Sequence, residues 1–221
     1  ARSTSYPRRL MTPERKTRII VISSPNYKDR EGKLIVDLME AGLWRFHLRK
    51  PNWNSDELRG LLDSVPGEYH HRIVMHRRKE LLDEYPLAGY HLTSKEAYPP
   101  QKPPGTLSRS FHDLDALRNC RERLDYTFLG PIFDSVSKQG YTAAFIPSDL
   151  RDFFRERRQE KGSRPLTFAL GGIVPDRVRL CLGLGFDGVA ALGAIWASRS
   201  PSRKLHRYIS AYPWIDKQHA E

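Results

Sequence analysis

The feature that most constrains the fold of this 221-residue chain is its regular alternation of apolar runs with amphipathic segments. Each apolar run has the length of one buried strand, and the segments between most of them repeat with helical periodicity. Eight strands with intervening helices favour an α/β fold, a single-domain, parallel (β/α)8 TIM barrel. We predict its strands at 18–24, 44–50, 71–76, 87–92, 106–111, 125–129, 166–170 and 188–192.

Helices are expected between these strands, with one exception. Residues 95–105 contain four Pro, so a loop is predicted in place of the helix after the fourth strand. The domain prediction is a barrel over 18–212, with a disordered basic tail at 1–17 and a C-terminal tail at 213–221. Helices are predicted at 33–41, 54–62, 77–84, 113–123, 148–161, 175–184 and 201–212.

The chain is basic, with 37 Lys and Arg against 26 Asp and Glu, a net charge of +11. The simplest interpretation of this charge is a solvated basic surface. A more specific interpretation is that the charge attracts phosphorylated substrates. No nucleic-acid-binding motif is present, so nucleic acid is not an expected partner. The two isolated cysteines give no sign of an oxidising compartment, and the longest apolar stretch, 180–197, is interrupted by Asp187. A cytoplasmic protein without a membrane span is expected.

Polar side chains cluster where the predicted strands end, which is where barrel enzymes place their chemistry. Such groups are costly to bury without a partner, and either a bound anion or an internal salt bridge supplies one. The second strand delivers His47, Arg49 and Lys50, the third His76 and Arg77, the fourth His91, Thr93 and Ser94, and the fifth Ser108, Ser110 and His112.

Four histidines, His47, His76, His91 and His112, each fall at the end of a different strand. Imidazoles that converge from separate strands can bind a metal ion or can serve as hydrogen-bonding and acid–base groups. No strand carries a His-x-His pair, so we favour substrate contacts and predict no metal bound by these side chains.

The segment after the sixth strand carries groups that can hold phosphate oxygens. Ser135, Ser137 and Lys138 follow Gly130-Pro131 within nine residues. The seventh strand ends in Gly171-Gly172 shortly before Pro175 at a helix start, and the eighth is followed by Gly193 and Ala194. Backbone amides at such glycines can approach an anion, and barrels often place a phosphate after their last two strands.

These motifs carry a family resemblance over residues 18–212. The stretch from Asp125 to Lys138 resembles the DYxxxGPxFxTxTK signature of thiamine phosphate synthases, with both Thr replaced by Ser. Ala169–Ile173 resembles the family's AIGGI strand, Ser110–His112 its SxH strand, and Leu192–Ile195 its VSAI strand end. The chain is thus similar to the superfamily of thiamine phosphate synthases and thiazole tautomerases (TenI-like), as a divergent, synthase-like member.

The resemblance implies a transferase of thiamine biosynthesis that couples hydroxymethylpyrimidine diphosphate with thiazole phosphate and releases diphosphate. These two small phosphorylated molecules would be its partners, and a homodimer is compatible with it. It implies catalytic roles for Lys138, Ser110 and His112. It places the diphosphate against His47, Arg49, Lys50, His76, Arg77, Ser110, Ser135, Ser137 and Lys138, and the thiazole phosphate against Gly171, Gly172, Gly193 and Ala194.

Departures from the family pattern leave the cofactor and the reaction open. The family's magnesium-binding Asp after the third strand is Arg77 here, and Glu96 is the acidic residue nearest the second Asp position. The usual Asp ligands of Mg²⁺ are therefore absent. Two alternatives remain: an isomerase similar to the thiazole tautomerases, with His112 as acid and base, or a non-catalytic barrel that binds a phosphorylated ligand.

Overall fold

Eight parallel strands close a barrel in chain order, with β1 paired to both β2 and β8. The computed structural model describes residues 17–26, 29–134, 145–160, 162 and 164–213. The predicted (β/α)8 barrel is confirmed, with each strand shorter than or equal to its predicted range. The strands are β1 (Ile19–Ile22), β2 (Arg45–Leu48), β3 (Ile73–His76), β4 (Gly89–Leu92), β5 (Thr106–Phe111), β6 (Tyr126–Leu129), β7 (Leu166–Ala169) and β8 (Gly188–Ala191).

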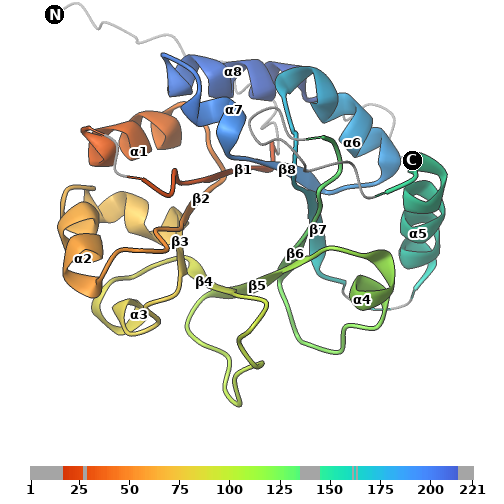
Figure 1. Ribbon diagram of the computed structural model, residues 1–221, viewed down its shortest axis with the longest axis horizontal. Helices are drawn as coiled ribbons and strands as arrows, with labels where there is room; N and C mark the ends of the chain where they lie inside the picture. Colours follow the sequence, from red (N-terminus) through yellow and green to blue (C-terminus); the bar gives the residue numbers. More distant parts are fainter. Residues whose placement is uncertain (1–16, 27–28, 135–144, 161, 163, 214–221) are drawn as a thin grey trace, which may run out of the picture.

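Helices surround the ring of strands (Figure 1). The connection from β4 to β5 holds no helix, as its four Pro predict, and it projects from the ring as a loop. No helix among the described residues is long and apolar enough to cross a membrane. The helices are α1 (Glu31–Glu40), α2 (Ser55–Asp63), α3 (Leu81–Glu84), α4 (Leu114–Arg118), α5 (Pro147–Gln159), α6 (Val178–Leu184), α7 (Gly193–Trp196) and α8 (Pro201–Ala211), with 3₁₀ turns η1 (Gly67–Arg72) and η2 (Pro175–Arg177).

The helix predicted over 77–84 is wrong in its first half. Arg77 and Arg78 have positive φ values of 61° and 48°, and an α-helix cannot run through left-handed residues. The helix therefore begins only at Leu81. The helix predicted over 113–123 is also too long, because only Leu117 of α4 is buried and the helix ends at Arg118.

The barrel interior is divided into an apolar and a polar sector. Strands β6, β7, β8 and β1 fill one sector with a buried cluster of Ile20, Ile22, Tyr126, Phe128, Phe168 and Ala190. Strands β2 to β5 fill the other with the buried side chains of His47, His76, His91 and Ser108. Buried polar side chains must form hydrogen bonds with one another or with a ligand. A site is therefore expected in this sector.

The carboxyl ends of β6 and β7 are packed directly against each other. Ile132 N–H donates to Leu170 O at 2.9 Å, which ties the segment after β6 to the end of β7. Gly171 has a φ of 95°, and a Cβ atom there would lie 2.6 Å from Pro131 Cα. Close backbone packing by itself therefore requires glycine at this strand end, whatever ligand lies nearby.

We predict that Gly171→Ala destabilises the fold by about 1–3 kcal/mol, because the substitution combines a left-handed φ with a backbone clash. Gly60→Ala is the matched control, because Gly60 lies inside α2 with open space around its Cα. That change should stabilise by roughly 0.5–1 kcal/mol. Urea unfolding of both variants measures the difference, and equal effects would contradict this packing.

Candidate active site

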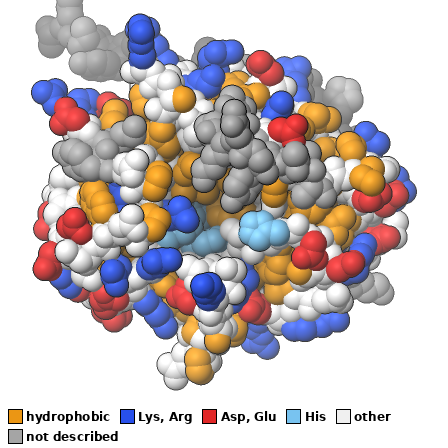
Figure 2. Space-filling model, viewed as in Figure 1, with side chains coloured by type: hydrophobic (Ala, Val, Ile, Leu, Met, Phe, Trp, Pro, Cys, Tyr) orange, Lys and Arg blue, Asp and Glu red, His pale blue; other side chains and the backbone are white. Residues whose placement is uncertain are grey.

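A pocket of about 340 Å³ opens at the carboxyl ends of the strands. The residues around it come from the ends of β1 to β7, and histidine side chains are visible in the central hollow of Figure 2, with Lys and Arg near its border. Phe128, Ile22 and Leu170 form its apolar side. The polar groups that line it include Arg49, Arg77, Lys95, His76, His91, Ser110 and His112.

Arg49 and Arg77 are positioned at this mouth through their backbones, and no acidic side chain among the described residues pairs with them. The Ser23 hydroxyl accepts from Arg49 N–H at 2.8 Å and donates to Arg49 O at 2.9 Å. In the described part of the chain, the Arg49 guanidinium itself has no hydrogen-bond or ion-pair partner. The Arg77 guanidinium donates a long hydrogen bond of 3.3 Å to Pro51 O. The Arg77 backbone, directly after β3, is left-handed. Such fixed but unneutralised cations suit an anionic ligand.

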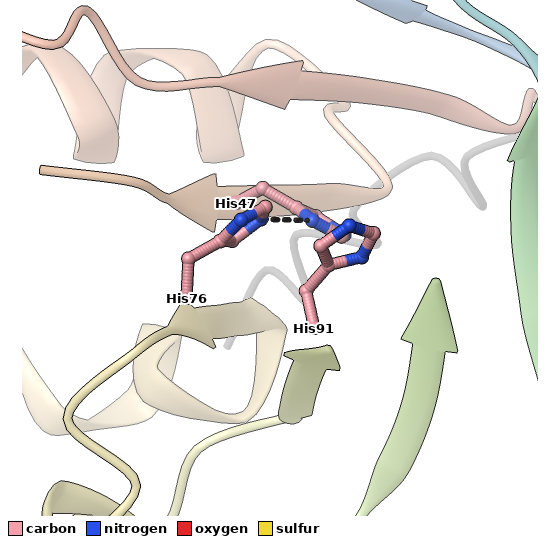
Figure 3. Close-up of side chains that lie close together, drawn as sticks. All are labelled: His47, His76 and His91. Carbon is pink, nitrogen blue, oxygen red and sulfur yellow. Dashed lines mark hydrogen bonds between the residues drawn. The ribbon is translucent and has the colours of Figure 1, made fainter. Parts of the chain in front are cut away.

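Three histidines, which we call the histidine floor, lie together at the base of the pocket: His76 and His91 line it and His47 is buried beside them (Figure 3). His47 from β2, His76 from β3 and His91 from β4 point toward one another, and their side chains are buried. His47 Nδ1 and His76 Nε2 share a hydrogen bond of 2.9 Å, and His76 stacks on His91 with ring centroids 4.3 Å apart. The predicted convergence of His47, His76 and His91 is therefore present.

Hydroxyl groups complete the hydrogen bonds of this floor. Tyr126 OH lies 2.7 Å from His47 Nε2 at the inner end of the cluster. His91 contacts Ser108 Oγ through Nδ1 at 2.8 Å and Ser110 Oγ through Nε2 at 3.1 Å. No carboxylate among the described residues bonds to these rings. Neutral imidazole is the form that such a set of hydroxyl partners stabilises.

Burial is the main reason that these rings stay neutral. Desolvation lowers the pKa of His47 and of His76 well below the ordinary value, and the charge of His91 adds to the effect. Burial, together with Arg109 and Arg49, lowers the pKa of His91 to about 3. Burial likewise raises the pKa of Tyr126 to about 12, so its hydroxyl remains protonated.

His112 stands apart from the cluster at the exposed rim. Its Nδ1 donates to Gly130 O at 2.8 Å, which assigns the proton of the neutral ring to Nδ1. Nε2 then carries a lone pair, which no hydrogen bond from the described residues occupies, so it can act as a base. The sequence grouped His112 with the other three histidines, whereas the structure gives it a separate position between β5 and β6.

Lys50 is held away from the anion-binding role that the sequence predicts for it. Its ammonium is fully buried and forms an ion pair of 2.6 Å with Glu31, whose carboxylate is also fully buried. It also donates to Asn26 O at 2.8 Å and lies over the Trp53 ring. This buried ion pair links the end of β2 to α1, and the sequence did not predict it.

The remaining predicted site residues lie on the opposite side of the mouth. Gly171 and Gly172 form the turn after β7, where Arg177 donates to Gly172 O at 2.7 Å. Gly193 and Ala194 begin α7 directly after β8. Ser135, Ser137 and Lys138 lie outside the described residues, so their predicted roles stay predictions.

The described residues do not fit the magnesium ion that the family resemblance implies. Mg²⁺ requires oxygen ligands, usually carboxylates, and no Asp or Glu is among the described residues that line the pocket. Glu96 already uses both oxygens, which accept from Tyr90 OH at 2.6 Å and Thr93 N–H at 2.7 Å. Arg77 occupies the strand end where the first Asp was expected.

Comparison with known proteins identifies the family. A family model described as thiamine monophosphate synthase matches residues 19–195, from β1 to α7. The chain belongs to the thiamine monophosphate synthase family. The resemblance carried by the sequence motifs is therefore confirmed.

Individual relatives of this family member are distant. A thiamine-phosphate synthase of Salinibacter ruber is 33% identical over 107 residues, which cover 48% of this chain and 43% of that enzyme. A crystal structure of thiamine phosphate pyrophosphorylase from Bacteroides thetaiotaomicron is 27% identical with a TM-score of 0.75, over 88% of this chain and 97% of that one. The Pyrococcus furiosus counterpart, 17% identical with a TM-score of 0.70 over 89% and 95%, shows the shared fold.

Several residues that shape the site in this family member were not predicted. Ser23 directly follows β1 and forms two hydrogen bonds with the Arg49 backbone, and its position as the first polar residue after an apolar strand was the available signal. Tyr126 belongs to the Asp125-Tyr126 motif, yet only the structure shows its hydroxyl on His47. Glu31 lies at the start of α1, where nothing in the sequence indicates a buried partner for Lys50.

We predict that Lys50→Met lowers the free energy of unfolding by about 3–5 kcal/mol, because it removes the ammonium that forms an ion pair with the buried Glu31 carboxylate. Glu31→Gln combined with Lys50→Met should recover much of the loss. Lys33→Met is the control, since the Lys33–Asp37 pair is solvent-exposed and worth at most about 0.5 kcal/mol. Urea unfolding measures all three, and a Lys50→Met variant as stable as the parent would contradict the buried pair.

The neutral histidine floor also predicts a pH dependence of stability. The unfolded rings bind protons near pH 6.5, whereas burial keeps the folded rings neutral to lower pH. Stability is therefore complete above about pH 6.5 and falls as the pH drops, by up to about 1.4 kcal/mol per unit for each ring. Urea unfolding from pH 7 to 5 measures this slope, which His91→Asn should reduce; a flat profile in the parent would contradict the neutral floor.

Proposed function

We propose that this protein is a thiamine phosphate synthase that couples hydroxymethylpyrimidine diphosphate with thiazole phosphate. The observation that carries the proposal is the pocket itself: Arg49, Arg77 and Lys95 surround a mouth whose described lining holds no carboxylate. A substrate with several negative charges fits this mouth. Membership of the thiamine monophosphate synthase family supports the choice of substrates.

In the proposed reaction the C–O bond between the pyrimidine methylene and the diphosphate breaks, and the diphosphate leaves with the electron pair. The thiazole nitrogen then forms the new C–N bond with its lone pair. Negative charge develops on the leaving diphosphate, so donors fixed at that position lower the barrier. Arg49, Arg77 and Ser110 are the described donors that would hold it, and the floor of His76 and His91 would face the pyrimidine ring.

Because the described residues do not fit Mg²⁺, the arginines are proposed to neutralise the diphosphate in its place. Arg77 supplies a permanent cation at the strand end where the family resemblance implies a carboxylate and its metal ion. The protein should then offer Mg²⁺ no ligand of its own, and any remaining magnesium effect would come from the ion carried by the diphosphate.

The deciding experiment mixes both substrates with the full-length chain and measures thiamine phosphate by chromatography, with and without Mg²⁺. We expect product under both conditions, and Arg49→Ala should reduce the rate by about 100-fold or more through the lost donor. Arg203→Ala, an exposed substitution on α8, is the control and should leave the rate unchanged. Lys138→Ala is also expected to lose activity. Absence of product under both conditions would refute the synthase.

One observation favours a second candidate, a tautomerase that acts on a thiazole phosphate. His112 donates through Nδ1 to Gly130 O, so Nε2 is left as an exposed base at the rim of the same pocket. Such a group could remove a proton from one ring position and return it to another. Proton exchange on thiazole carboxylate phosphate that His112→Ala abolishes, without any coupled product, would support this reaction instead.

A further inference from the structure

The buried histidines of the floor bring nitrogen atoms together in a way that suits a metal ion. One ring nitrogen from each of His47, His76 and His91 lies within 4.8 Å of the other two. The rings come from three adjacent strands, β2, β3 and β4, so the sheet fixes their backbones (Figure 3). We propose that these three side chains form a binding site for a divalent transition-metal ion of the Zn²⁺ and Co²⁺ class.

The distances agree with three nitrogens on one ion after small side-chain rotations. Nitrogen ligands at 2.0–2.1 Å from a tetrahedral ion lie about 3.4 Å from each other. His47 Nδ1 and His76 Nε2, now 2.9 Å apart, would separate slightly as the ion replaces the proton between them. His91 would tilt out of its stacked contact with His76 and exchange the Ser110 hydroxyl for the ion.

The outer nitrogens of His47 and His91 already have partners of the kind that ligating imidazoles use. Metal-bound histidine donates its second N–H to a fixed acceptor, which sets the tautomer and the ring orientation. With Nδ1 of His47 on the ion, its Nε2–H would donate to the Tyr126 oxygen, 2.7 Å away. With Nε2 of His91 on the ion, its Nδ1–H would donate to Ser108 Oγ, 2.8 Å away. The rings stay neutral, so binding moves protons between ring nitrogens without releasing any.

The donor set selects the class of metal ion. Imidazole suits Zn²⁺, Co²⁺, Ni²⁺ and Cu²⁺, whereas Mg²⁺ and Ca²⁺ need oxygen ligands that this floor does not offer among its described residues. His76 and His91 also line the pocket, so a fourth coordination position would face the space beneath Arg49. Three histidines and one open position are the arrangement of a catalytic rather than a structural zinc site.

Cobalt titration of the metal-depleted, full-length chain tests the proposal without any substrate. Intense visible absorption of tetrahedral or five-coordinate Co²⁺ should saturate at one ion per chain, and Zn²⁺ should abolish it. His91→Asn should weaken cobalt binding by about 100-fold or more, because it removes a ligand. His206→Asn, a substitution of an exposed histidine on α8, should leave it unchanged.

A second variant keeps the test valid if His91→Asn does not fold. Tyr126→Phe retains all three ligands and removes only the acceptor for His47, so we expect binding about 10–100-fold weaker with the same spectrum. Circular dichroism confirms that each variant is folded. Absence of the visible bands in the parent, or bands of equal strength and affinity in folded His91→Asn, would overturn the site.

Discussion

The burial of three imidazoles without an acidic partner is the constraint on which the rest of the site depends. His47, His76 and His91 lose their hydration inside the barrel, and their hydrogen bonds run to one another and to hydroxyls. Charged imidazolium would be costly there, so the floor stays neutral. The polar sector of the barrel can therefore lie against the aromatic cluster of β6 and β7 without introducing buried charge.

The positively charged side chains near this neutral floor differ in the partners that they contact. Arg49 and Arg77 lie above it without acidic partners in the described part of the chain, whereas Lys50 is withdrawn into an ion pair with Glu31. The two residues that follow β2 therefore differ in their surroundings: Arg49 is exposed at the mouth, and Lys50 joins the end of the strand to α1. The pocket thus has an anion-attracting rim above a neutral cluster of histidines.

The sequence predicted the fold well because the alternation of apolar runs and helical segments is local information. It also placed four histidines at one barrel mouth, since parallel strands bring their carboxyl ends to the same edge; three of them pack together, and His112 lines the same pocket apart from them. Side-chain alternation places Arg49 and Lys50 on opposite faces of the second strand, but the sequence could not show that Lys50 pairs with Glu31, because that carboxylate comes from a helix start elsewhere in the chain. It extended the helix after β3 too far, because nothing local shows that Arg77 and Arg78 adopt left-handed backbones. The sequence explained the glycines after β7 by the approach of an anion, whereas backbone packing against Pro131 accounts for Gly171 without a ligand.

The most direct test of this account is the protonation state of the three buried rings. Histidine ¹⁵N chemical shifts, recorded from pH 7 to pH 5 on the full-length chain without added metal and assigned with single His→Asn variants, report it for each ring. We predict that His47, His76 and His91 keep the shifts of neutral imidazole throughout this range. Titration of these rings with midpoints near the ordinary value of about 6.5 would contradict the neutral floor.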